Sequence, residues 1–129
     1  MEKPRHWMRS VAGIALAGAL AGCAAGGGMN RLTQDQESEL ATYVGAYHFC
    51  VARTASRLDD GQSPIVGIST RALDYCQPEA RGIDTYLGSL KLPPKDRSDY
   101  LAELVRSAAN HSAIMLRHIR DRESGAGGI

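Results

Sequence analysis

Two cysteines in this 129-residue chain could act together in thiol chemistry, or could bridge two segments. Cys50 and Cys76 are 26 positions apart. Redox dithiols are typically Cys-X-X-Cys pairs, in which the pKa of one thiol is lowered, and a haem attachment site would read Cys-X-X-Cys-His. The sequence contains neither pattern. A structural disulfide therefore explains this pair better than a catalytic thiol pair does.

Three histidines could contribute ligands to a metal ion. His111 and His118 are seven residues apart, or ~10.5 Å along a helix, whereas helical metal-binding pairs are usually three or four residues apart. His48 could join them from another segment, but no pattern in the sequence positions it there. We expect these histidines to lie at the edge of the core and not to bind a metal ion. A metal-binding protein or enzyme that uses His48, His111 and His118 is an alternative.

The acidic residues are explained by helix ends rather than by acid–base catalysis. Asp59 and Asp60 suit a turn, while Asp96 and Asp99 suit the first turn of a helix. No nucleophile elbow accompanies the serines and histidines. We therefore expect no catalytic residue, and we do not expect an enzyme.

The elements that position these residues are helices. Thr33-Gln34-Asp35-Gln36 fits a capping box, and Gly61 suits a helix C-terminus. Ser63-Pro64 indicates a cap followed by proline at the first helical position, and Pro78 must stop or kink that helix. The expected helices run from about 33 to 61, from 63 to Pro78, from 79 to 90 and from 96 to 121.

Each expected helix carries one apolar stripe, and the sequence shows no strand-like alternation. The stripes are Leu40, Val44, Tyr47, Val51 and Leu58; Ile65, Ile68, Ala72 and Cys76; Ile83, Leu87 and Leu90; and Leu101, Leu104, Val105, Ala108, Ser112, Met115 and Ile119. The predicted fold is all-α: a small four-helix bundle, with one helical hairpin stapled by a disulfide and two further helices.

The hairpin spacing supports the disulfide. A short loop, Gly61-Gln62-Ser63, implies an antiparallel pair of helices. Cys50 lies 12 residues before Gln62 and Cys76 lies 14 residues after it, and both face inward on their helices. Positions equidistant from the turn lie side by side in such a pair. A bond between Cys50 and Cys76 is therefore predicted.

The N-terminal segment has the composition of an export signal. Basic residues (Lys3, Arg5 and Arg9) outnumber the one acid, Glu2, and an uncharged run over 11–21 follows. This run is about half the ~20 residues that a membrane-spanning helix needs. Small residues then lead to Cys23. We expect secretion into an oxidising compartment, which favours the disulfide.

The stretch Leu20-Ala21-Gly22-Cys23 resembles the lipobox of bacterial lipoprotein precursors in both order and position. The resemblance covers residues 1–23 and implies cleavage between Gly22 and Cys23 and acylation of Cys23. It accounts for the odd number of cysteines, and the covalent lipid is the only cofactor expected. Ala24, where an aspartate commonly causes inner-membrane retention, implies the outer membrane, facing the periplasm.

The expected organisation has four parts: a signal peptide at 1–22, lipidated Cys23 with a flexible tether over 23–32, a helical domain at 33–122 and a disordered tail at 123–129. The Gly-rich residues 24–30 should reach ~13–16 Å. Removing the signal leaves 12 basic and 13 acidic residues, a balance that argues against nucleic acid as a partner. The basic cluster over 117–122 could touch anionic lipid headgroups, although a solvated helix end is the simpler interpretation.

These features predict a membrane-anchored envelope lipoprotein with a non-catalytic binding or structural role. Its partners would be membrane lipid, through the acyl anchor on Cys23, and another envelope protein. Its size, anchor and helix content are similar to those of pilotins, small outer-membrane lipoproteins that bind a helix of a secretion component. The likeness is architectural, because no local motif matches. A pilotin-like chaperone is therefore an alternative function.

Overall fold

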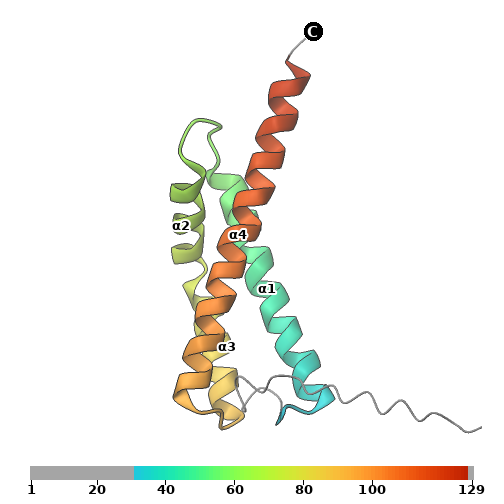
Figure 1. The fold of residues 1–129 in the computed structure, drawn as a ribbon, viewed down its shortest axis with the longest axis vertical. Helices are drawn as coiled ribbons and strands as arrows, with labels where there is room; N and C mark the ends of the chain where they lie inside the picture. The colour runs from blue at the N-terminus through green and yellow to red at the C-terminus, as the bar shows by residue number, and fades with distance from the viewer. Residues whose placement is uncertain (1–30, 128–129) are drawn as a thin grey trace, which may run out of the picture.

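The computed structural model describes residues 31–127, and within them it is built of four α-helices without a strand (Figure 1). The helices are α1 (Gln34–Leu58), α2 (Ile65–Tyr75), α3 (Gln77–Ser89) and α4 (Pro94–Ala126). The predicted small all-α bundle is confirmed. In the described range, no helix combines the length and the apolar character that crossing a membrane would require.

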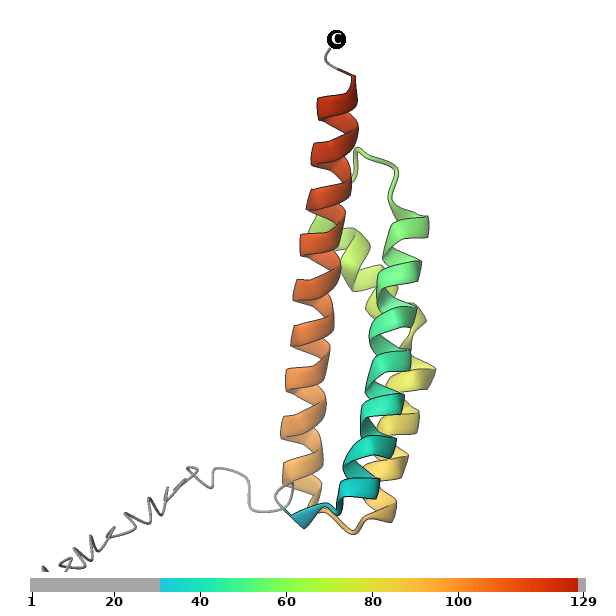
Figure 2. The same cartoon turned by 90° about the vertical axis from the view of Figure 1, so that its right-hand side faces the viewer.

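The four helices follow an up-down-up course. Helix α1 runs from one end of the bundle to the loop before α2, α2 and α3 return one after the other, and α4 runs parallel to α1 and extends past that loop (Figures 1 and 2). Only Cys76 separates α2 from α3. An antiparallel turn between two helices needs 2–5 residues, so α3 continues in the general direction of α2 instead of folding back on it. Helix α1 consequently packs against all three other helices.

The start of α1 follows the predicted capping box. The Gln36 amide donates to Thr33 Oγ1 at 3.2 Å, and the Thr33 amide donates to Gln36 Oε1 at 2.9 Å. The predicted cap at Ser63 is wrong, because α2 begins at Ile65 behind Pro64. Ser63 instead donates its amide and its hydroxyl to the Asp60 carboxylate at 2.7 and 2.6 Å. The turn therefore uses the side chain that would have capped the helix.

Helix α4 is longer at both ends than predicted. It begins at Pro94 rather than 96 and ends at Ala126 rather than 121. Residues 123–126 are therefore helical, which corrects the disordered tail expected there. No proline interrupts this segment, and Gly125 lies in the last turn, where a poor helix former costs least. The last residues of the expected tail, 128–129, lie outside the described range.

The chain crosses the bundle three times, along α1, along α2 and α3 together, and along α4, and we call each crossing a stroke. The core lies between the three strokes. Its fully buried members include Tyr47, Val51, Ile68, Cys76, Ile83 and Leu87. On α4 the buried positions recur every four residues, at Leu104, Ala108, Ser112 and Leu116. The predicted stripe left out Leu116 and wrongly included Val105, which is 36% exposed. A spacing of four residues keeps one face of a helix toward its neighbours, and Val105 lies one residue outside it.

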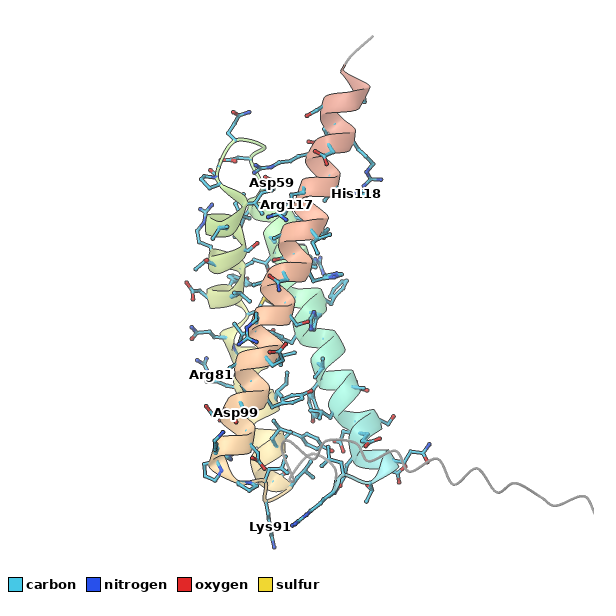
Figure 3. The ribbon with its side chains drawn as sticks, viewed as in Figure 1. Asp59, Arg81, Lys91, Asp99, Arg117 and His118 are labelled. Carbon is cyan, nitrogen blue, oxygen red and sulfur yellow. A yellow bond between two sulfur atoms is a disulfide. The ribbon has the colours of Figure 1, made fainter. Side chains whose placement is uncertain are left out.

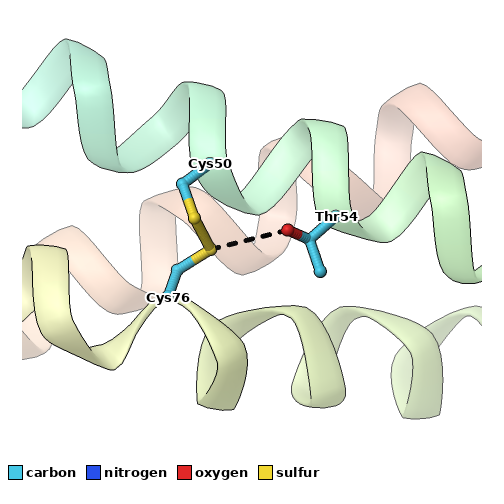
Figure 4. Close-up of a disulfide and its surroundings, with 3 residues drawn as sticks. All are labelled: Cys50, Thr54 and Cys76. Carbon is cyan, nitrogen blue, oxygen red and sulfur yellow. Dashed lines mark hydrogen bonds between the residues drawn. A yellow bond between two sulfur atoms is a disulfide. The ribbon is translucent and has the colours of Figure 1, made fainter.

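The disulfide joins the middle of α1 to the junction of α2 and α3 (Figure 4). The Cys50 and Cys76 sulfurs are 2.06 Å apart and their Cα atoms are 6.1 Å apart, within the usual range for a disulfide. Cys76 is fully buried and Cys50 is half-buried. The Thr54 hydroxyl lies 3.8 Å from the Cys76 sulfur. The bond predicted from the hairpin spacing is confirmed.

At the far end of the bundle, α4 holds the loop between α1 and α2. Arg120 Nη2 donates to Asp59 Oδ1 at 2.5 Å and to the Ser63 carbonyl at 2.8 Å. Gly61, with φ of 71°, takes the left-handed backbone that the loop needs, and its amide donates to Asp59 Oδ1 at 3.1 Å. The hydrogen bond from Arg120 lowers the pKa of Asp59.

Reduction of the disulfide should destabilise the domain strongly. Closing a loop of 26 residues removes unfolded-state entropy equivalent to ~3–4 kcal/mol, which corresponds to a fall of about 15–25 °C in Tm for a domain of this size. Thermal melting with and without reductant measures this fall. The double variant Cys50→Ala/Cys76→Ala is the control, and reductant should leave its Tm unchanged. An unchanged wild-type Tm would contradict the stabilising role.

The Arg120–Asp59 contact should stabilise the fold in a pH-dependent way. Because the folded-state pKa of Asp59 is lowered, its contribution is fully present above the ordinary value of 3.8 and disappears as pH falls through the folded-state pKa. Arg120→Ala should lower Tm at pH 7 by roughly 5 °C, and the gap from wild type should narrow in acid, where only the bond to the Ser63 carbonyl remains. Arg122→Ala, an exposed arginine in the same helix, is the matched control. A gap that stays constant down to pH 2 would contradict this role of Asp59.

Candidate functional site

The predicted lipidation site lies outside the described residues. Gly22 and Cys23 precede residue 31, as does the whole predicted signal peptide. The described chain enters the bundle at the start of α1, beside the connector between α3 and α4 (Figure 1). An anchor on Cys23 would thus attach to this end of the domain, which we call the entry end.

The cysteines do not provide a metal site in this structure. Cys50, Cys76 and Glu79 are the only group of three or more His, Cys, Asp or Glu within residues 31–127 whose ligand atoms all lie within 4.8 Å of one another. Both sulfurs are used in the disulfide. Cysteine binds a metal as its thiolate, which this bond removes. The group is therefore a structural disulfide with the Glu79 carboxylate beside it.

The structure brings two of the three candidate histidines together. The rings of His48 on α1 and His111 on α4 have centroids 6.1 Å apart and are tilted by 78°. His48 is half-buried and His111 is exposed. Burial and the neighbouring His111 both lower the pKa of His48, so its neutral form is favoured at pH 7. A half-buried and an exposed imidazole thus meet between parallel helices.

His118 does not join this pair. It lies seven residues beyond His111, about 10.5 Å farther along α4, and is exposed (Figure 3). The three-histidine site considered from the sequence is thus reduced to a pair. His118 is a solvent-facing histidine on the same helix as His111, so it can serve as a control position for His111.

Sequence reasoning named His48 and His111 together only in an alternative and could not place them side by side, because their pairing depends on the direction of α4. His48 is about 21 Å from the start of α1, and His111 is about 26 Å from the start of α4. These heights match only if both helices start at the same end of the bundle. The position of each histidine at the edge of an apolar stripe was the available signal, and the parallel course of the helices was the missing one.

The basic cluster of α4 lies far from the entry end. In Figure 3, Arg117 lies close to Asp59 of the loop between α1 and α2, whereas Lys91 lies at the other end of the bundle. Helix α1, which runs between these ends, is about 37 Å long, whereas the tether should reach ~13–16 Å. Arg120 is engaged with Asp59. The geometry therefore favours a solvated helix end over contact with lipid headgroups.

At the entry end the surface is hollowed. A hollow of about 550 Å³ lies between the start of α1 and the connector before α4. Its lining includes Arg31, Leu32, Leu90, Lys91 and Leu92, and no histidine. It therefore lacks the histidines that the enzyme alternative would require in its pocket.

Large exposed apolar side chains are spread over the bundle. Phe49, Val66 and Ile114 are 64%, 72% and 63% exposed and belong to α1, α2 and α4. Each is two residues from a buried position, and two residues turn a helix by about 200°. Each therefore points away from the core. Tyr75, at the end of α2, is also 73% exposed.

Comparison of this chain with protein-family models, with curated proteins and with solved structures gave no match. Two features of the chain itself bear on its function: the Leu-Ala-Gly-Cys stretch before the domain, and the His48–His111 pair within it.

Proposed function

We propose that this chain is a bacterial envelope lipoprotein, in which lipid on Cys23 anchors a helical domain that acts by binding or by a structural role, without catalysis. The observation that carries the proposal is the order of three segments: a basic start, an uncharged apolar run and Leu20-Ala21-Gly22-Cys23. Its predicted location is the outer membrane, facing the periplasm. Another envelope protein is its expected protein partner.

The domain has two properties that suit this role. It contains a disulfide, and disulfides persist in oxidising compartments such as the periplasm. Its first helix is capped at Thr33, ten positions after Cys23, so the tether between lipid and domain is short. A short tether would keep the entry end near the membrane and direct the Arg120 end away from it.

The pilotin-like alternative ranks second. A chaperone that binds an amphipathic helix needs an exposed apolar groove or patch. The most exposed large apolar side chains, Phe49, Val66, Tyr75 and Ile114, are divided among α1, α2 and α4, and none of these helices carries a row of them. We therefore favour a binding or structural role that does not require capture of an apolar helix.

Replacement of the predicted lipidation site gives the first test. Cys23→Ser should leave an uncleaved chain that takes up no labelled fatty acid, because the acyl group is added to the cysteine sulfur. Intact-mass measurement of the membrane-extracted protein should show a wild-type chain that starts at Cys23 and carries acyl mass. Cys50→Ala/Cys76→Ala is the matched control and should still be acylated. Acylation of Cys23→Ser, or a wild-type chain with its leader intact and residue 23 unmodified, would refute the proposal.

The residue after the cysteine gives the second test. Ala24→Asp should move the protein from the outer-membrane to the inner-membrane fraction, since aspartate there commonly causes retention in this class of lipoproteins. Ala24→Ser is the control and should leave the distribution unchanged. Separation of the two membranes on a density gradient, followed by immunoblotting, measures the shift. Wild-type protein in the inner-membrane fraction would contradict the predicted location.

A further inference from the structure

The His48–His111 pair is the chemically distinctive feature of the described surface. The two imidazoles come from helices that are distant in sequence, and their ring centroids are 6.1 Å apart. The Tyr47 ring lies against the edge of His48, with centroids 6.2 Å apart and planes at 79°. Tyr47 is buried and His111 is exposed. One side of the pair is therefore supported by the core, and the other is open to solvent.

The distance between the rings is compatible with a shared metal ion. A metal–nitrogen bond of ~2.1 Å, together with roughly 1.1 Å from nitrogen to ring centre, allows two imidazoles on one ion to have centres at most about 6.4 Å apart. Tetrahedral geometry would bring the centres to about 5.2 Å. The observed 6.1 Å is within that limit, and tetrahedral geometry would require the exposed His111 ring to move about 0.9 Å closer to His48.

We propose that His48 and His111 form a two-imidazole site for a borderline divalent transition-metal ion, with water completing the coordination. Imidazole nitrogen suits Cu²⁺, Ni²⁺ and Zn²⁺, and affinity for such a site peaks at Cu²⁺. Mg²⁺ and Ca²⁺ prefer oxygen ligands. Within residues 31–127, the only group of three or more His, Cys, Asp or Glu residues whose ligand atoms all lie within 4.8 Å of one another is the disulfide group with Glu79, so His48 and His111 are not part of a three-residue cluster.

Metal binding at this site would link α1 to α4. The disulfide already links α1 to the α2–α3 stroke. An ion held by His48 and His111 would connect the remaining stroke to α1, and binding to the folded state alone would raise its stability. The site stands on geometry within the bundle and does not depend on the lipid anchor.

Cu²⁺ titration of the full chain, purified in detergent micelles, tests the proposal. The wild-type protein should bind one ion, with nitrogen hyperfine splitting from two imidazoles in the electron paramagnetic resonance spectrum. His48→Ala and His111→Ala should each weaken binding about ten-fold or more. His118→Ala is the matched control, because this exposed histidine lies on the same helix, and binding should be unchanged.

Thermal melting with Zn²⁺, which has no redox chemistry, gives an independent readout. Saturating Zn²⁺ should raise Tm of the wild type and of His118→Ala by several degrees, and should leave Tm of His111→Ala unchanged. His111 is exposed, so His111→Ala should melt like the wild type when metal is absent. Wild-type affinity in His48→Ala and His111→Ala, no binding by the wild type, or loss of binding in His118→Ala would overturn the proposal.

Discussion

The arrangement of this bundle depends on the single residue that separates α2 from α3. Cys76 ends one helix, begins the next and carries the bond to Cys50 of α1. One residue is too few to reverse the chain, so two helices share one return stroke. The disulfide holds the junction of α2 and α3 against the middle of α1. Because the return stroke ends at the entry end, α4 must start there and run parallel to α1.

Features set by neighbouring residues, or by spacing from a single loop, could be predicted from the sequence. The Thr33–Gln36 box and the break near Pro78 depend on nearby residues, and the pairing of Cys50 with Cys76 follows from their similar distances from the loop between α1 and α2. Other features depend on competition or on distant packing. Ser63 could have capped α2, but the Asp60 carboxylate binds it more directly. The end of α4 was harder to predict, because nothing after residue 121 stops a helix and no partner is needed to continue it for a turn.

The histidine pair shows why a candidate site can remain hidden in a sequence. If α3 had folded back against α2, α4 would have run in the opposite direction, and the height of His111 along the bundle would have changed. His48 and His111 lie at similar heights because the four helices cross the bundle only three times, which makes α4 parallel to α1. The boundary of a helix can thus be correct while the contacts of its side chains stay undetermined. The sequence pattern predicted the helices, but it did not predict the direction of α4.

The last turns of α4 continue past Arg120, the final residue that contacts the loop between α1 and α2. Residues 121–126 are exposed on every side (Figure 2). Such a helix end is held only by its own backbone hydrogen bonds, and those open without disturbing the core. Backbone amides there should exchange their hydrogens orders of magnitude faster than those around Ser112, so one continuous helix would combine a rigid base with a fraying tip.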